Sequence, residues 1–257
     1  MENNFYNIFD SHAHYDDKWF DEDREVLLSS MKENGVCGIV NNAVDLKTAK
    51  VCIDFCEKYD FMYGAVGLHP ENLEDMPNDY LDRVAELLKH KKIVAVGETG
   101  LDYHWDIPKD LQHRVFEEQI KLSLDVNMPI IVHDREAHGD TLNYLRKYKP
   151  KALVHCFSGS VEMMREVMRY GSYISLGGVV TFKNARHSVE VAKEVPIDRL
   201  LLETDCPYMS PVPFRGKRCD STMIKYTAEK IAEIRKTDVQ ELLNITAENA
   251  KRFYGID

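Results

Sequence analysis

The sequence lacks any long apolar run, and its first residues form no apolar signal region. A transmembrane helix needs about 20 consecutive apolar residues, so we expect no membrane partner. Cysteine is scarce: none of the six cysteines belongs to a Cys-x-x-Cys pair. Cys52 and Cys56 have the spacing of neighbours on one helix face, which favours a place in the core. These absences predict a protein of the reducing cytoplasm.

Basic residues are also fewer than acidic ones. The chain has 33 Lys and Arg against 43 Asp and Glu, a formal net charge of −10. Proteins that coat duplex nucleic acid use a broad basic face, so this class is excluded. A phosphate substrate is not excluded, because bound divalent cations reverse the local field. No linker, low-complexity segment or short repeat is present, and no obligate protein partner is evident.

Eight apolar, β-rich runs recur along the chain. They span 8–14, 36–42, 61–69, 93–98, 129–133, 152–155, 173–176 and 200–205. Several are apolar at nearly every position, which is typical of parallel strands buried on both faces. Eight strands alternating with helices over about 250 residues predict an α/β fold of the TIM (β/α)8 type, in a single domain over residues 1–257. A doubly wound sheet is the rival, but its Gly-x-Gly-x-x-Gly turn is missing.

Apolar residues between these runs recur at helical spacing. The stripes comprise Ala49, Cys52, Ile53 and Cys56; Leu81, Val84, Ala85 and Leu88; Phe116, Ile120, Ser123 and Leu124; Val161, Met164 and Met168; and Ile224, Ala228 and Ile231. Residues 237–240, Thr-Asp-Val-Gln, are typical of a capping box that starts a last helix. The irregular segment 206–220 follows the last predicted strand and should lie over the mouth of the barrel.

Histidines and acids stand where the predicted strands end. His12 and His14 are two residues apart in a strand, so both imidazoles point to one face. The later strands end near His69, Glu98, His133, His155 and Asp205. Each residue alone has an ordinary structural explanation, but the C-terminal strand ends of a barrel converge on one site. Mixed imidazole and carboxylate donors suit zinc, manganese or iron(II), and tolerate magnesium.

The whole chain resembles the TatD family of metal-dependent deoxyribonucleases, within the amidohydrolase-like metal barrels. The motifs are 9–14 (Phe-Asp-Ser-His-Ala-His), 66–70 (Val-Gly-Leu-His-Pro), 96–102 (Val-Gly-Glu-Thr-Gly-Leu-Asp), 132–133 (Val-His), 155–159 (His-Cys-Phe-Ser-Gly), 202–208 (Leu-Glu-Thr-Asp-Cys-Pro-Tyr) and the closing 249–250 (Asn-Ala). The resemblance implies a TIM barrel, up to two divalent metal ions (Mg2+, Mn2+ or Zn2+) and a DNA substrate.

The resemblance also assigns roles to the strand-end residues. It implies that one metal binds His12 and His14, that Glu98 bridges two metals without a carbamylated lysine, that His133 and His155 bind the second, and that Asp205 is the acid of the last strand. We expect Glu98 and Asp205 to be catalytic, with Asp205 as general base. The chain departs from the family at 219–221, where Cys-Asp-Ser replaces Asn-Glu-Pro, so substrate preference stays open.

The substrate-binding residues are less clear from the sequence. His69 is read as a hydrogen-bond donor to a phosphate oxygen, or as a structural residue against Pro70. Arg215 is the better phosphate-binding arginine and Arg135 the weaker one. An aromatic residue among 103–105 (Tyr-His-Trp) would stack on a terminal base or pack within its loop.

We expect a divalent-metal-dependent hydrolase that acts on DNA phosphodiesters, exonuclease-like on single-stranded or frayed ends, with RNA as a further substrate to consider. The same site would serve a rival hydrolase of another ester or amide, such as an aminoacyl-tRNA deacylase, lactonase or amidase. A non-catalytic barrel that serves binding or assembly is the alternative from another class.

Overall fold

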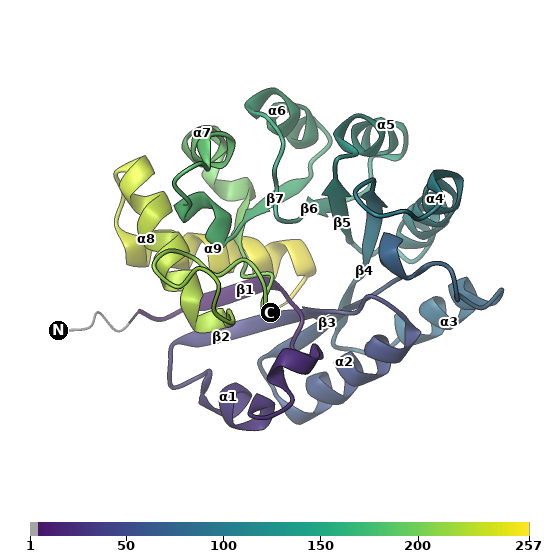
Figure 1. Cartoon of the computed structure of the whole chain (residues 1–257), viewed down its shortest axis with the longest axis horizontal. Helices are drawn as coiled ribbons and strands as arrows, with labels where there is room; N and C mark the ends of the chain where they lie inside the picture. The colour runs from purple at the N-terminus through teal and green to yellow at the C-terminus, as the bar shows by residue number, and fades with distance from the viewer. Residues whose placement is uncertain (1–4, 257) are drawn as a thin grey trace.

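The structure, a computed structural model, describes residues 5–256. Its centre is one sheet of eight parallel strands, hydrogen-bonded in sequence order and surrounded by helices (Figure 1). The strands are β1 (Ile8–Ala13), β2 (Val36–Asn42), β3 (Met62–Val66), β4 (Ile93–Asp102), β5 (Ile130–Arg135), β6 (Ala152–Val154), β7 (Tyr173–Leu176) and β8 (Leu200–Leu202). The predicted single-domain (β/α)8 barrel is confirmed.

Helices follow the strands along the chain and cover the outside of the sheet (Figure 1). The α-helices are α1 (Arg24–Ser30), α2 (Leu46–Lys58), α3 (Tyr80–Leu87), α4 (Lys109–Asp125), α5 (His138–Tyr148), α6 (Val161–Arg169), α7 (Arg186–Glu194), α8 (Ile224–Arg235) and α9 (Val239–Tyr254). Short 3-10 helices are η1 (Lys18–Phe20), η2 (Pro70–Asn72), η3 (Gly178–Thr181), η4 (Ile197–Arg199) and η5 (Ser221–Met223). Within the described residues, no helix combines the length and apolar character of a membrane span.

The predicted apolar stripes lie in α2, α3, α4, α6 and α8, and most of their residues contact the core. Cys52 and Cys56 are both buried, as predicted. Leu124 does not fit its stripe: it is 44% exposed, in the last turn of α4. The predicted capping box has Thr237 as the N-cap of the last helix. In the structure the N-cap is the next residue, Asp238, whose side chain accepts the N–H of Glu241, so α9 begins at Val239.

A second core fills the inside of the barrel and is closed by α9. Every strand contributes at least one inward side chain: Phe9, Val40, Ala65, Val94, Ala95, Ile131, Leu153, Tyr173 and Leu201. The C-terminal half of α9 adds Ala247, Ala250, Phe253 and Tyr254. The helix therefore covers the end of the barrel where the strands begin. The opposite end stays free for a site, as in other barrels of this type.

The barrel is joined between β8 and β1 largely by side chains. The buried carboxylate of Asp10 accepts the backbone N–H of Thr204 at 3.0 Å, its hydroxyl at 2.6 Å and the Ser221 hydroxyl at 2.7 Å. Beside it, the N–H of Asp205 donates to the carbonyl of His12 at 3.0 Å. Asp10 thus fixes the backbone that carries two of the candidate site residues.

Candidate metal centre

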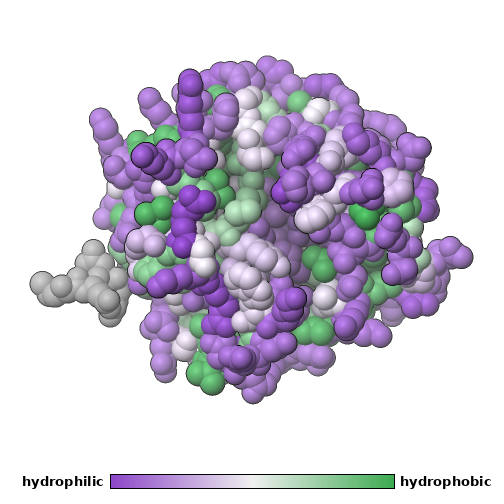
Figure 2. Space-filling view, viewed as in Figure 1, coloured by the Kyte–Doolittle hydropathy of each residue, from purple (hydrophilic) through white to green (hydrophobic). Residues whose placement is uncertain are grey.

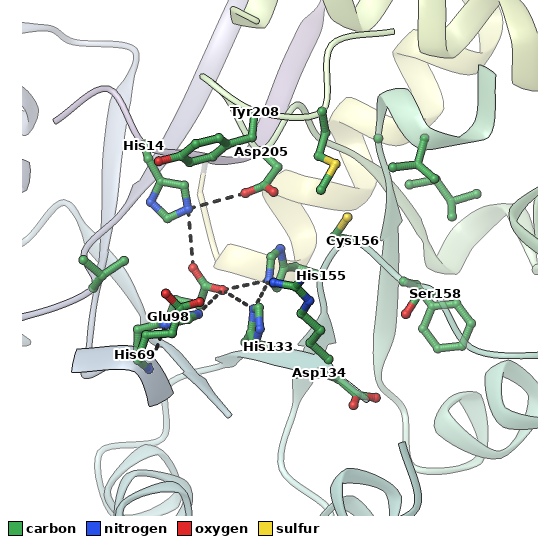
Figure 3. A pocket seen from close by; sticks show the side chains of 18 of the residues that line it. His14, His69, Glu98, His133, Asp134, His155, Cys156, Ser158, Asp205 and Tyr208 are labelled. Carbon is green, nitrogen blue, oxygen red and sulfur yellow. Dashed lines mark hydrogen bonds and ion pairs between the residues drawn. The ribbon is translucent and has the colours of Figure 1, made fainter. Parts of the chain in front are cut away.

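The structure brings the six predicted ligands together at the C-terminal ends of the strands, and all of them except His12 are labelled in Figure 3. They are His12 in β1, His14 directly after it, Glu98 in β4, His133 in β5, His155 directly after β6, and Asp205 three residues after β8. Glu98 and His133 lie within strands, because β4 and β5 continue four and two residues beyond the runs that the sequence predicts. β8 ends earlier than predicted, so Asp205 lies in a turn.

Glu98 is at the centre of the cluster, and its two oxygens face different histidine pairs. Oε2 lies 3.2 Å from Nε2 of His12 and 3.4 Å from Nε2 of His14. Oε1 lies 2.8 Å from Nε2 of His155 and 2.9 Å from Nδ1 of His133. One carboxylate therefore connects two groups of nitrogen donors, an arrangement that suits a bridging ligand.

Asp205 lies on the side of the first histidine pair. Its Oδ1 is 3.5 Å from Nε2 of His14 and 3.7 Å from Nε2 of His12. The residue has a left-handed backbone (φ 57°), a conformation that Asp tolerates better than most residues. This turn directs its carboxylate back over the ends of the strands.

The spacing and chemistry of the donors fit divalent metal ions. Ligand atoms around a tetrahedral ion lie about 3.4 Å apart, since each is about 2.1 Å from the metal. The separations of Glu98 Oε2 from His12 and His14, 3.2 and 3.4 Å, are close to this value, whereas those of Oε1 from His155 and His133, 2.8 and 2.9 Å, are hydrogen-bond lengths that would open by about half an ångström around an ion. His14 donates its Nδ1 proton to the carbonyl of Asn42 at 2.9 Å, which leaves Nε2 free as a ligand.

Electrostatics favour ionised carboxylates and charged rings of His14 and His133 when no metal is bound, whereas burial lowers the pKa of His12. Burial alone would raise the pKa of Glu98, but His155, His12 and His69 hold it well below its usual range. Burial would lower the pKa of His14, yet Asp205 and Glu98 raise it to about 9. A divalent cation that enters the site would therefore replace protons on the imidazoles.

His69 joins the cluster but differs from the other histidines. Its Nε2 lies 3.4 Å from Oε1 of Glu98, within reach of a metal site. Its Nδ1 accepts the backbone N–H of Glu71 at 3.2 Å, so Nε2 carries the proton of the neutral ring. Burial lowers the pKa of His69, which keeps the ring neutral. The geometry therefore makes His69 a hydrogen-bond donor.

The site lies at the bottom of a cavity of about 680 Å³. Figure 2 shows this face of the molecule hollowed near its centre, with hydrophobic side chains reaching the surface beside the hollow. The residues that line the cavity include six carboxylates, a single arginine, Arg135, and no lysine. Tyr208 and Met209 also line it, so the segment after β8 reaches the mouth, as predicted.

Only some of the other predicted substrate-binding residues line the cavity. Arg215 is exposed and stacks on the ring of Phe182 at 4.0 Å, outside the cavity lining. Tyr103 packs against α4 and α5, because its hydroxyl bonds to the Asp140 carboxylate and to the His113 ring. Trp105 lines the cavity and is 49% exposed. Ser221, in the segment that departs from the family pattern, donates its hydroxyl proton to the Asp10 carboxylate.

Three buried acids lie beside the candidate ligands and hold the surrounding backbone and side chains. Asp10 holds β8 to β1, Asp102 contacts His133, and Glu203 accepts the backbone N–H of Cys156. Glu203 Oε1 lies 3.7 Å from Nδ1 of His155, too far for a hydrogen bond.

Fold and site together define a metal-dependent hydrolase built on a (β/α)8 barrel. Comparison with known proteins agrees with this class. The chain belongs to the TatD family, because the profile described as TatD related DNase matches residues 9–255.

Relatives and solved structures match over nearly the whole chain. YabD of Bacillus subtilis, an uncharacterized metal-dependent hydrolase, is 46% identical over 254 residues, which cover 97% of this chain and 100% of YabD. YcfH of Escherichia coli, described in the same words, is 35% identical over 257 residues, or 97% of this chain and 96% of YcfH. The crystal structure of YjjV, a TatD homologue from Escherichia coli, superposes with a TM-score of 0.92 at 29% identity, covering 98% and 99% of the two chains.

Proposed function

We propose that the protein is a metal-dependent phosphodiesterase that removes nucleotides from single-stranded or frayed DNA ends. The observation that carries the proposal is the central position of Glu98 between two groups of nitrogen donors, which suits a pair of divalent cations. His12, His14, His133, His155 and Asp205 are the other proposed ligands. The family description, TatD related DNase, supports DNA as the substrate class.

The charge of the cavity supports the need for metal ions. Six carboxylates line it, against Arg135 and the imidazoles that the carboxylates keep protonated, so the lining is net acidic and favours cations over a phosphate. Two bound cations would reverse this field. A cavity lined by six carboxylates also suits a strand end better than a continuous duplex, whose backbone prefers a broad basic face.

Each side chain has a distinct part in the proposed reaction. When bound, a pair of divalent ions polarises a phosphodiester and lowers the pKa of a nearby water. Asp205 would accept a proton from that water, because the imidazoles beside it keep its carboxylate ionised despite burial. The Nε2 proton of His69 would donate to a phosphate oxygen. Arg135, rather than Arg215, is the arginine that reaches the cavity, and Trp105 offers a ring for a terminal base.

A variant of the proposed base tests this assignment. Asp205→Asn keeps the size of the side chain and removes its basicity, so turnover of end-labelled single-stranded DNA should fall roughly 100-fold or more. Asp140→Asn, an equal change at an exposed acid on α5, serves as the control and should retain full activity. Both proteins are stripped with chelator and reloaded with pure Mg2+ or Mn2+. Parental turnover by Asp205→Asn would show that another group is the base.

A substrate panel separates DNA from the rival substrates. The panel contains labelled single-stranded DNA, blunt duplex, frayed duplex, RNA, an aminoacyl-tRNA and a lactone, each with Mg2+, Mn2+ and Zn2+. Shortening of the single-stranded and frayed DNA from their ends, one nucleotide at a time, is the expected result. Faster hydrolysis of the carboxyl esters, with intact DNA, would assign the site to the rival class of hydrolase.

A further inference from the structure

Asp102 is a buried acid that contacts a proposed metal ligand from behind. It is 1% exposed and lies at the C-terminal end of β4. Its Oδ2 is 2.9 Å from Nε2 of His133, and its Oδ1 accepts the backbone N–H of His104 at 2.9 Å. Its own backbone N–H and carbonyl are both bonded to the side chain of Gln112. The carboxylate is therefore held in one orientation.

We propose that Asp102 is a positioning residue that fixes the tautomer of His133. An ionised carboxylate only accepts hydrogen bonds, so Nε2 of His133 must carry a proton. With Nε2 protonated, Nδ1 is the ring nitrogen that can give up its proton, and its lone pair then faces Glu98, where a metal ion would bind. The inference rests on the proposed role of His133 as a metal ligand and adds the reason why its Nδ1, rather than Nε2, faces the site.

His69, the neighbour of His133, has the opposite tautomer for an equally local reason. The two rings are 4.4 Å apart between centroids, and both face Oε1 of Glu98. The backbone N–H of Glu71 fixes His69 with its proton toward the site, whereas Asp102 fixes His133 with its lone pair toward the site. One ring becomes a donor and the other a ligand.

Two substitutions at this position have opposite consequences for the ring. In Asp102→Asn, the N–H of His104 requires the amide oxygen at the position of Oδ1, which turns the NH2 group toward His133. Nε2 must then accept, the proton moves to Nδ1, and Nδ1 can no longer bind a metal. In Asp102→Ala the same charge is lost, but Nε2 can keep its proton with water as partner.

The test measures Zn2+ binding to the two variants by calorimetry at a fixed pH, with Zn2+ as the only ligand. Loss of a residue that orients a metal ligand costs about 10- to 100-fold in affinity. We expect Asp102→Asn to lose about 100-fold at the site that includes His133, and Asp102→Ala about 10-fold. A merely structural role predicts the reverse order, since the isosteric Asn would disturb the fold less than Ala.

Controls separate this inference from the proposed function. His133→Ala should weaken one Zn2+ site, and if it binds Zn2+ like the parent, the ligand assignment itself fails. If His133→Ala is impaired but Asp102→Asn binds as well as or better than Asp102→Ala, only the tautomer inference is overturned. Asp140→Asn and Asp140→Ala, the same changes at an acid that accepts from Tyr103, should bind like the parent.

A spectroscopic measurement on the parent does not depend on the folding of any variant. In Zn2+-loaded protein with 15N-labelled histidine, the ring of His133 should show a proton on Nε2 and none on Nδ1. A proton on Nδ1 would overturn the inference.

Discussion

Asp10 shows how one side chain can serve both the fold and the site. Burial raises its pKa to about 7, although Thr204, Ser221 and the N–H of His12 all donate to it. Asp10→Ala would leave several buried donors without a partner, at about 1–3 kcal/mol each. We expect the free energy of unfolding to fall by about 3–5 kcal/mol in urea titrations.

Asp10→Asn is the matched comparison. A carboxyl with a pKa near neutrality is almost as stable uncharged as charged, so a neutral group of the same shape should be tolerated better. We expect Asn to cost about half as much as Ala or less. Equal losses for the two variants would mean that the charge, and not the set of hydrogen bonds, holds β8 to β1.

His138 gives a pH dependence that can be isolated. Its Nδ1 lies 2.8 Å from Oδ2 of Asp134, and this contact raises the pKa of His138 above its usual 6.5. The contact stabilises the fold fully below the pKa that His138 has in the unfolded chain. This stabilisation is lost as the pH rises through the higher pKa that His138 has in the folded protein. The side chain is 41% exposed, so solvent limits the effect to about 1 kcal/mol or less.

His138→Gln tests this contribution. The melting temperature of the parent should exceed that of the variant more at pH 5.5 than at pH 9, with both proteins in the same metal buffer. Other titrating groups are common to the two proteins and cancel in the difference. A gap that stays constant or widens toward pH 9 would contradict the assigned sign.

At the residue level, the sequence predicted the six clustered side chains but not the contacts of Asp10 and Asp102 behind them. His12 and His14 follow from strand periodicity, and His155 and Asp205 from the convergence of strand ends. The contact of Asp102 with His133 depends instead on the pairing of β4 with β5, in which a register shift falls between Val96 and Thr99. No local pattern in the sequence encodes that shift.

At the level of the strands, Gly100 allows β4 to approach β5 beside the site. It pairs with His133, has a φ of 152°, and a Cβ built on it would lie 2.0 Å from the carbonyl oxygen of His133. Gly100→Ala should therefore push the strands apart and lower the free energy of unfolding by about 2 kcal/mol or more. Zn2+ binding should weaken with it, because His133 would move.

Gly139→Ala is the control for this change. Gly139 lies in the first turn of α5, and a Cβ there meets no atom within 4 Å. Alanine favours a helix over glycine by up to about 1 kcal/mol, so this variant should be as stable as the parent or more so. The measurement is urea titration of both variants. If Gly100→Ala leaves the free energy of unfolding unchanged, the close approach of β4 to β5 at Gly100 is not required.

The elements also show where prediction from sequence ends. Apolar runs located all eight strands, but β8 stops at Leu202 and Asp205 has a left-handed backbone. Strand propensity alone would continue the strand, because Thr204 is a good strand residue. The backbone N–H of Asp205 donates to the carbonyl of His12 in β1, which lies nearly two hundred residues earlier in the chain. Long-range contacts of this kind have no signature in a local window.

For the whole molecule, the net charge of −10 and the acidic cavity lead us to expect that bound divalent cations stabilise the fold. The donors meet only in the folded barrel, so a metal ion binds the native state far better than the unfolded chain. At 100 times its dissociation constant, a ligand adds about 2.7 kcal/mol. For a protein of this size that corresponds to roughly 5–10 °C in melting temperature. Chelation should reverse the increase.

General screening of acidic repulsion would also stabilise the protein, so the effect must be assigned to the site. Sodium chloride at equal ionic strength screens all the carboxylates and should give only a small increase. Glu98→Gln removes one charge of many, yet it removes the group that connects both nitrogen pairs. In that variant the increase with Zn2+ or Mn2+ should nearly vanish, while the response to sodium chloride stays parental. Equal stabilisation of parent and variant by the divalent ions would place their binding elsewhere on the acidic surface.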